Sequence, residues 1–217
     1  MDPNSHNLFQ AARYGETEVV RQHLDIEGTN IDAKDYRGLT SLQIACIYGH
    51  LDVVRLLLDR GANIEAAGGS TGETALMSAS MNGRHNIVKE LLDRGANIEA
   101  ADTFRGWNSL MWASFKGYPI IVKELVDRGA NIFAKNIAGV TARQIAYDAP
   151  EVEKFLREKE QAIGRKGLAE AVVKNRRTGP DVPTDVQKKI MGYLGGRKKR
   201  TKRKLVRRKK QKGTRRR

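Results

Sequence analysis

Apolar positions in the first 160 residues fall into short groups with helical spacing, and glycines separate the groups. The group within residues 8–12 stops at Gly15, and a second group occupies residues 17–24. Such spacing predicts two short amphipathic helices joined by a glycine turn. Similar pairs follow, with predicted helices at 40–48, 51–59, 86–93 and 121–127, and a shortened last helix through residues 152–156.

One sequence returns at a fixed interval behind these helices. LLDRGANIEA occupies Leu57–Ala66 and Leu91–Ala100, and LVDRGANIFA occupies Leu125–Ala134, each 34 residues after the previous copy. A constant period of this length indicates stacked units, because one helix pair cannot bury its apolar face alone. The sequence therefore predicts an all-α repeat solenoid of about five helix-turn-helix units with hairpin loops. Residues 7–33 form its N-terminal cap, and the unit around Pro150 forms its C-terminal cap.

The repeating positions of residues 35–64 read D-x-x-G-x-T-x-L-x-x-A-x-x-x-G-H-x-x-V-V-x-L-L-L-x-x-G-A-N-I. This pattern resembles the ankyrin repeat, and the resemblance covers about residues 5–160. It implies a hairpin, an inner helix and an outer helix in each unit, stacked into a shallow groove. The usual T-P-L-H opening lacks its proline and histidine throughout, so looser helix starts and moderate stability are expected. The third and fourth hairpins each hold one extra residue, so their tips are expected to project further.

The positions that do not repeat are the candidates for function. The resemblance implies that hairpin tips and the exposed face of the inner helices line a protein-binding groove. Aromatic residues and arginine dominate interface energies, and both tryptophans lie within residues 104–115. The sequence therefore predicts a groove centred on the fourth unit. The predicted protein-binding residues are Tyr36, Arg37, Tyr48, Met81, Phe104, Arg105, Trp107, Trp112 and Phe115.

Four of these aromatic residues, Phe115 among them, have an alternative interpretation as packing residues. Trp112 takes a position that faces the core in the other units, where isoleucine or serine stands. Phe104 and Trp107 are expected in an exposed turn, and the alternative is burial against a neighbouring unit.

Charge divides the chain of 217 residues into two parts. Residues 1–160 carry 18 Lys and Arg against 22 Asp and Glu, a net −4, whereas residues 161–217 carry 22 against 3, a net +19. An asymmetry of this kind indicates an interaction tail. We expect a repeat domain at 1–160, a linker with short amphipathic helices at 161–196, and a disordered basic tail at 197–217.

In the tail, 15 of the 21 positions are Lys or Arg and none is acidic. Such a run lacks the apolar residues for a core and is expected to stay disordered. It fits a nuclear import signal read by an importin, or a nucleic-acid binder that attracts phosphate groups. Attraction to an anionic membrane surface ranks lower. The candidate residues are Arg197, Lys198, Lys199, Arg200, Lys202, Arg203, Lys204, Arg207, Arg208, Lys209 and Lys210.

An amphipathic helix is predicted before the tail. Thr184 can cap it, and one face carries Val186, Ile190, Tyr193 and Leu194. Over about 13 residues it resembles the opening helix of an F-box. That resemblance implies a substrate adaptor for ubiquitin ligation. The favoured alternative is a helix that packs on the repeats or awaits a partner.

Candidate chemistry is sparse. The single cysteine, Cys46, precedes His50 by four residues, but it takes the place of a buried small residue in the other units. The four histidines lack metal-site spacing, and no glycine-rich phosphate loop joins a strand to a helix. We therefore expect no enzyme, cofactor or metal. With neither a signal peptide nor an apolar membrane span expected, the prediction is a monomeric intracellular protein, nuclear or cytoplasmic, that binds a protein partner.

Overall fold

The computed structural model describes the backbone of residues 3–178 and the side chains of residues 8–165. Helices dominate this part of the chain, which contains isolated β-bridges in its hairpin loops but no strand. The helices are α1 (Pro3–Tyr14), α2 (Thr17–Leu24), α3 (Ser41–Tyr48), α4 (Leu51–Asp59), α5 (Ala75–Met81), α6 (His85–Asp93), α7 (Ser109–Phe115), α8 (Pro119–Asp127), α9 (Ala142–Ile145) and α10 (Pro150–Thr178).

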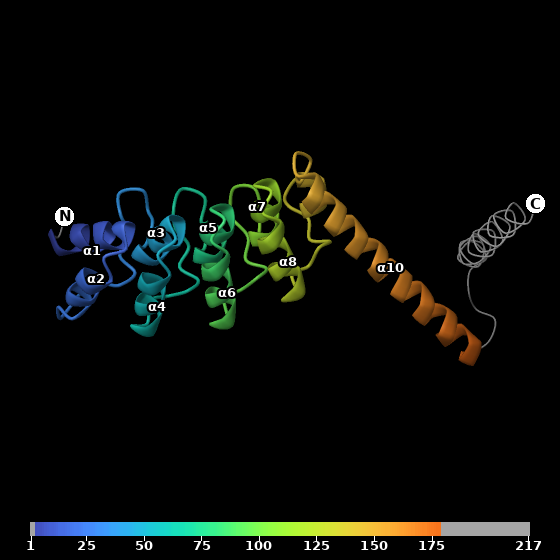
Figure 1. Cartoon of the computed structure of the whole chain (residues 1–217), viewed down its shortest axis with the longest axis horizontal. Helices are drawn as coiled ribbons and strands as arrows, with labels where there is room; N and C mark the ends of the chain where they lie inside the picture. Colours follow the sequence, from blue (N-terminus) through green and yellow to red (C-terminus); the bar gives the residue numbers. More distant parts are fainter. Residues whose placement is uncertain (1–2, 179–217) are drawn as a thin grey trace, which may run out of the picture. The chain divides into compact units, whose positions relative to one another are not determined.

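Helix pairs stand beside one another in chain order (Figure 1). The inner helices α1, α3, α5, α7 and α9 contact one another in that order, and α2, α4, α6 and α8 form the outer row. The hairpins that link the units hold the bridges Lys34–Thr40, Gly68–Glu73, Ala101–Asn108 and Lys135–Thr141. The predicted all-α repeat solenoid with hairpin loops is confirmed.

Small side chains let neighbouring inner helices approach closely. Cys46, Ser80 and Ser114 occupy the same position in three successive inner helices, and all are fully buried. The outer helices fill the interfaces with aliphatic residues, of which Leu57, Leu91 and Leu125 are equivalent and fully buried. Burying one leucine side chain stabilises the fold by about 1.5–3 kcal/mol. The stability of each unit therefore comes largely from its neighbours.

The inner helices begin at defined caps, so the expectation of looser helix starts is wrong. The side chains of Thr40, Thr74 and Asn108 accept hydrogen bonds from backbone N–H groups three residues on, at 3.3, 3.4 and 3.0 Å. Gln43 completes a capping box, because its Oε1 accepts from the Thr40 backbone N–H at 2.9 Å. Its Nε2 also donates to the carbonyl of Glu73 in the next unit. These side chains supply the caps that proline and histidine were expected to provide.

Glycine at the end of an inner helix makes room for the next unit. Gly49 adopts φ 93° and Gly83 φ 73°, both in the left-handed region that glycine adopts without strain. The guanidinium of Arg84 lies over Gly49 and donates to the carbonyl of Ile47 at 3.0 Å. The ring of Tyr118 covers Gly83 in the same manner. Each turn thus serves as a contact surface for the following repeat.

A repeated ion pair links the outer helices. At each interface, an aspartate at the end of one outer helix or directly after it faces a cation of the next unit. The pairs are Asp25–Arg60 at 2.7 Å, Asp59–Arg94 at 2.6 Å, Asp93–Arg128 at 2.7 Å and Asp127–Lys159 at 3.2 Å. Because they are exposed to solvent, these pairs define the alignment of the units more than their stability.

The last helix differs from the prediction. Instead of a shortened helix followed by a linker, α10 runs through 29 residues, Pro150–Thr178. It continues through Gly164 and Gly167, in the region where the sequence predicts a linker with short helices from residue 161 on. The proline stands at the first position, where its missing N–H costs nothing. Each glycine costs only about 1 kcal/mol in a helix, which the surrounding helix-forming residues offset.

Candidate protein-interaction surface

The hairpin tips form a continuous edge, because backbone hydrogen bonds join each tip to the next. The donors are the N–H groups of Gly69, Thr103 and Ile137. They bond to the carbonyls of Gly38 at 2.9 Å, Thr71 at 2.8 Å and Arg105 at 3.2 Å, respectively. A ligand that lies along this edge would therefore meet positions fixed relative to one another.

Asp102 shapes the tip of the fourth hairpin. Its buried carboxylate oxygen Oδ1 accepts backbone hydrogen bonds from Phe104 at 3.1 Å, Arg105 at 2.6 Å and Gly106 at 3.2 Å. With its backbone held in this way, Phe104 leaves 69% of its surface exposed. The local sequence therefore presents an aromatic ring to solvent on a rigid turn.

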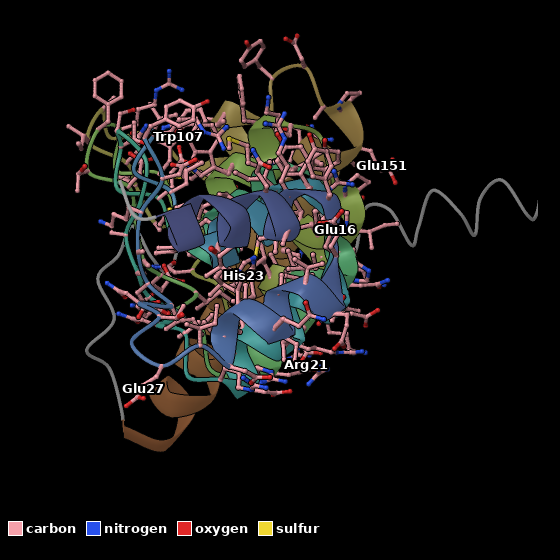
Figure 2. All side chains as sticks on the ribbon, turned by 90° about the vertical axis from the view of Figure 1, so that its left-hand side faces the viewer. Glu16, Arg21, His23, Glu27, Trp107 and Glu151 are labelled. Carbon is pink, nitrogen blue, oxygen red and sulfur yellow. The ribbon has the colours of Figure 1, made fainter. Side chains whose placement is uncertain are left out.

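Three aromatic rings pack together beside this tip. Trp107 and Trp112 lie 4.7 Å apart between ring centroids, with edge-to-face geometry, and Phe115 lies 5.3 Å from Trp107. Only 9% of Trp107 and 8% of Trp112 is exposed, whereas Phe115 remains exposed at its edge. Figure 2 shows Trp107 on the side of the repeats where the connecting loops gather.

The expectation that Trp107 lines an exposed groove is wrong. It packs against Trp112, on the inner helix of its own unit, and the packing alternative for Trp112 also holds. Edge-to-face aromatic pairs are worth about 0.5–1.5 kcal/mol beyond the area they bury. Both tryptophans therefore lie beneath the surface and contribute little exposed area.

Two cations lie over this aromatic cluster. The guanidinium carbon of Arg105 is 5.1 Å from the ring centroid of Trp107 and 5.8 Å from that of Phe104. The ammonium of Lys116 is 5.6 Å from the Phe115 centroid. Contacts of this kind contribute about 0.5–1 kcal/mol at exposed sites and leave the cations' outer faces in water. The structure thus brings together five predicted residues, Phe104, Arg105, Trp107, Trp112 and Phe115.

The other predicted groove residues belong to the second and third units. Tyr36 is almost fully exposed at its tip, with Arg37 stacked 5.6 Å from its ring. Tyr48 is half-buried and Arg13 lies 5.1 Å from its ring, while Met81 packs partly against the core. Tyr36 and Arg37 thus belong to a hairpin tip, whereas Tyr48 and Met81 end the inner helices α3 and α5 and lie outside the aromatic cluster.

Sequence reasoning missed two exposed residues in the fifth unit. Ile137 occupies a hairpin tip and leaves 73% of its surface exposed, next to the fourth tip. An aliphatic residue at a tip position was the available signal. Tyr147 is also strongly exposed, although it takes the position of the small buried Cys46. Because α9 ends at Ile145, this position no longer faces the core.

The one cysteine has the properties of a core residue. Cys46 is fully buried, and burial raises the pKa of its thiol. Ring atom Nε2 of His50 lies 2.8 Å from the backbone carbonyl of Arg13 and is engaged there.

Within the described part of the chain, no cluster of three or more His, Cys, Asp or Glu side chains could hold a metal ion. None of the described helices combines the length and apolar character needed to cross a membrane.

The predicted tail residues Arg197–Lys210 and the helix face Val186–Leu194 lie outside the described residues. Their roles remain predictions from the sequence.

Stacked helix pairs joined by hairpins define a repeat solenoid, a class of protein that presents one extended surface to its partners. A family model described as ankyrin repeats (3 copies) matches residues 8–102 and 68–136, which together cover more than half of the chain. The chain belongs to the ankyrin-repeat family, as the sequence pattern indicated. No curated protein matches the chain. Ankyrin repeats are a protein–protein interaction module, typically without enzymatic activity, so the chain binds protein partners through this fold.

Proposed function

We propose that this protein is a non-enzymatic adaptor whose ankyrin repeats bind a protein through the hairpin edge centred on the fourth unit. The observation that carries the proposal is the exposed Phe104 ring, held on a turn that Asp102 fixes, beside Arg105, whose guanidinium also lies over two buried tryptophans. An exposed aromatic anchor on a rigid support binds with little loss of conformational entropy. Exposed Ile137 extends the apolar surface along the same edge.

The basic C-terminal segment adds a second function to this proposal. Its 15 Lys and Arg among residues 197–217 would direct the adaptor to the nucleus through an importin, or hold it on nucleic acid. We place the protein inside the cell on this basis, in the nucleus or cytoplasm.

A capture experiment tests the adaptor proposal. The full chain, Phe104→Ala and Phe133→Ala are used as baits, and bound proteins are identified by mass spectrometry. Phe133 is a matched control, because it is an exposed phenylalanine in the loop after α8, before the Lys135–Thr141 hairpin and not at a tip. We expect the specific partner to be lost with Phe104→Ala and kept with Phe133→Ala. A partner list that is the same for all three baits would contradict the proposed surface.

A second candidate function rests on the charge asymmetry. If the tail is the functional element, the protein is a nucleic-acid binder and the repeats serve as an anchor. The full chain is compared with a chain ending at Leu194 for binding to single-stranded RNA at several salt concentrations. Because each neutralised phosphate releases counterions, the truncation should lower both the affinity and its salt dependence. Equal affinity and equal salt slope would remove this candidate.

The F-box-like helix is a third proposal with its own test. Val186, Ile190, Tyr193 and Leu194 would form its apolar face. Copurification with a ubiquitin-ligase subunit that disappears with Ile190→Asp would support a substrate adaptor. Copurification unchanged by that substitution, or its absence from the full chain, would contradict it.

A further inference from the structure

We infer that the fourth-unit surface recognises an acidic peptide segment in which an aromatic or aliphatic residue is flanked by Asp or Glu. This inference rests on the proposed adaptor function and names the chemistry of its partner. It depends on a comparison of two arginines, Arg37 and Arg105, that occupy the tips of two hairpins in the same chain.

In the second hairpin, Arg37 is already paired. Its Nε donates to Oδ2 of Asp35 at 3.0 Å, and the same carboxylate accepts the backbone N–H groups of Arg37 and Leu39 through Oδ1. The hairpin's own aspartate thus satisfies the guanidinium. A carboxylate from a partner would have to compete with Asp35.

In the fourth hairpin, the corresponding pair does not form. The extra residue places Arg105 three positions after Asp102, and the guanidinium lies over Trp107, Trp112 and Phe104 instead. Oδ1 of Asp102 is occupied by backbone N–H groups, and its buried Oδ2 has no hydrogen-bond partner within the described structure. Neither Arg105 nor nearby Lys116 has an ion pair with any described residue. Two exposed cations with unused N–H donors therefore border one aromatic cluster.

A carboxylate is the ligand that such a guanidinium binds best. An arginine stacked on aromatic rings is held in place and presents the edge of its planar fork, which matches a carboxylate with two parallel hydrogen bonds. The apolar contacts come from Phe104, Phe115 and Ile137, which remain exposed around the cations. The repeat domain as a whole carries a net −4, so this positive site is a local feature. An acidic segment with one apolar side chain complements both parts of the surface.

Single-stranded RNA fits the same surface less well. Sequence-tolerant RNA binding uses aromatic faces on which bases can stack. The largest rings here, Trp107 and Trp112, are more than nine-tenths buried. The negative repeat domain also opposes a phosphate backbone, whereas the positive tail attracts it independently of this surface.

The chain provides its own reporter for the test. Both of its tryptophans lie in the aromatic cluster, and the tail contains none. Tryptophan emission of the full chain therefore responds to binding at the fourth unit, and a chain ending at Leu194, measured in parallel, removes any contribution from peptide bound to the tail. The probe is a short synthetic peptide with one phenylalanine flanked on both sides by glutamates. A matched peptide carries glutamine in place of every glutamate.

The protein variants are Arg105→Gln and Arg37→Gln, each of which removes one positive charge and leaves the tail intact. We expect saturable binding of the glutamate peptide, about tenfold weaker binding of the glutamine peptide, and a similar loss with Arg105→Gln, as for one charge-assisted hydrogen bond. Arg37→Gln should bind like the unaltered chain. Circular dichroism checks that both variants remain folded.

Several outcomes would overturn the inference. These are no saturable emission change up to about 1 mM peptide, equal affinity for the two peptides, or equal losses with both arginine variants. A stronger response to polyuridine RNA than to the glutamate peptide would assign the surface to nucleic acid. If capture of a partner depends on Phe104 but the acidic peptide fails, the adaptor proposal stands and only this inference falls.

Discussion

Alanine at Gly68 is expected to weaken the interface between the second and third units through one side chain, Gln43. A Cβ atom added at Gly68 would lie 2.0 Å from Oε1 of Gln43, far inside van der Waals contact. The backbone of Gly68 does not have positive φ, so the substitution introduces no left-handed strain. The whole effect should therefore come from displacement of the buried glutamine.

The magnitude follows from the contacts that Gln43 would lose. It caps α3 by accepting the Thr40 N–H at 2.9 Å, and it donates to the Glu73 carbonyl across the unit interface. Loss of a cap costs about 1 kcal/mol, and loss of a neutral hydrogen bond about 1 kcal/mol. The Glu73 carbonyl keeps its bond from the Gly68 N–H at 2.9 Å, so no further penalty arises there. Gly68→Ala should therefore destabilise the chain by about 2 kcal/mol.

A double-mutant cycle measures whether this reasoning holds. Urea unfolding is followed by circular dichroism for the unaltered chain, Gly68→Ala, Gln43→Ala and the double variant. Each single variant should lose about 2 kcal/mol, a shift of about 1 M in the urea midpoint. In the Gln43→Ala background, alanine at Gly68 should cost less than about 0.5 kcal/mol, because the obstructing side chain is gone. Additive losses would refute the assigned contact.

Two further predictions concern the repeat framework. Gly83→Ala and Gly95→Ala both place alanine at positive φ, but only at Gly83 would the new Cβ meet another side chain, at 3.0 Å. Gly95→Ala should cost about 1–2 kcal/mol in chemical unfolding, and Gly83→Ala more; equal losses would contradict the described packing. Hydrogen bonds from Arg94, and then from Arg55, hold the pKa of Glu90 below its ordinary value. Their stabilisation is complete above the ordinary glutamate pKa and is lost as pH falls through the lowered folded-state pKa. Glu90→Gln should therefore destabilise the chain at neutral pH and lose this effect in acid, and a difference independent of pH would contradict the assignment.

The repeating part of the fold was predictable because it depends on local signals. The outer helices Thr17–Leu24 and Leu51–Asp59 have the predicted bounds, since glycine or polar residues flank each apolar group. The long helix Pro150–Thr178 was not predicted, because the glycines within it were expected to interrupt a helix. Glycine ends a helix where the chain must turn back, and no following repeat imposes that turn after Pro150.

The aromatic composition of the candidate site was evident from the sequence, but its geometry was not. The concentration of aromatic residues pointed to the fourth unit, and exposed Phe104 agrees with that expectation. The burial of Trp107 depends on Trp112, five residues on, turning its ring toward the hairpin. The free guanidinium of Arg105 depends on the extra turn residue and on these rings together. An arrangement that depends on several side chains at once cannot be recognised from the periodic pattern of the sequence.

The aspartate pairs along the outer row bear on how arrays of this type change length. Because Asp25, Asp59 and Asp93 each meet the arginine of the following unit in the same way, a unit that is duplicated or removed in register would restore the same bridge. The turns that follow the inner helices are not equivalent in this way. The side chain that covers each of these turns differs between units, as with Arg84 and Tyr118. Gain or loss of a repeat would thus be tolerated along the outer edge and penalised at the inner turns. When the number of repeats changes during evolution, compensating substitutions are therefore expected at those turns.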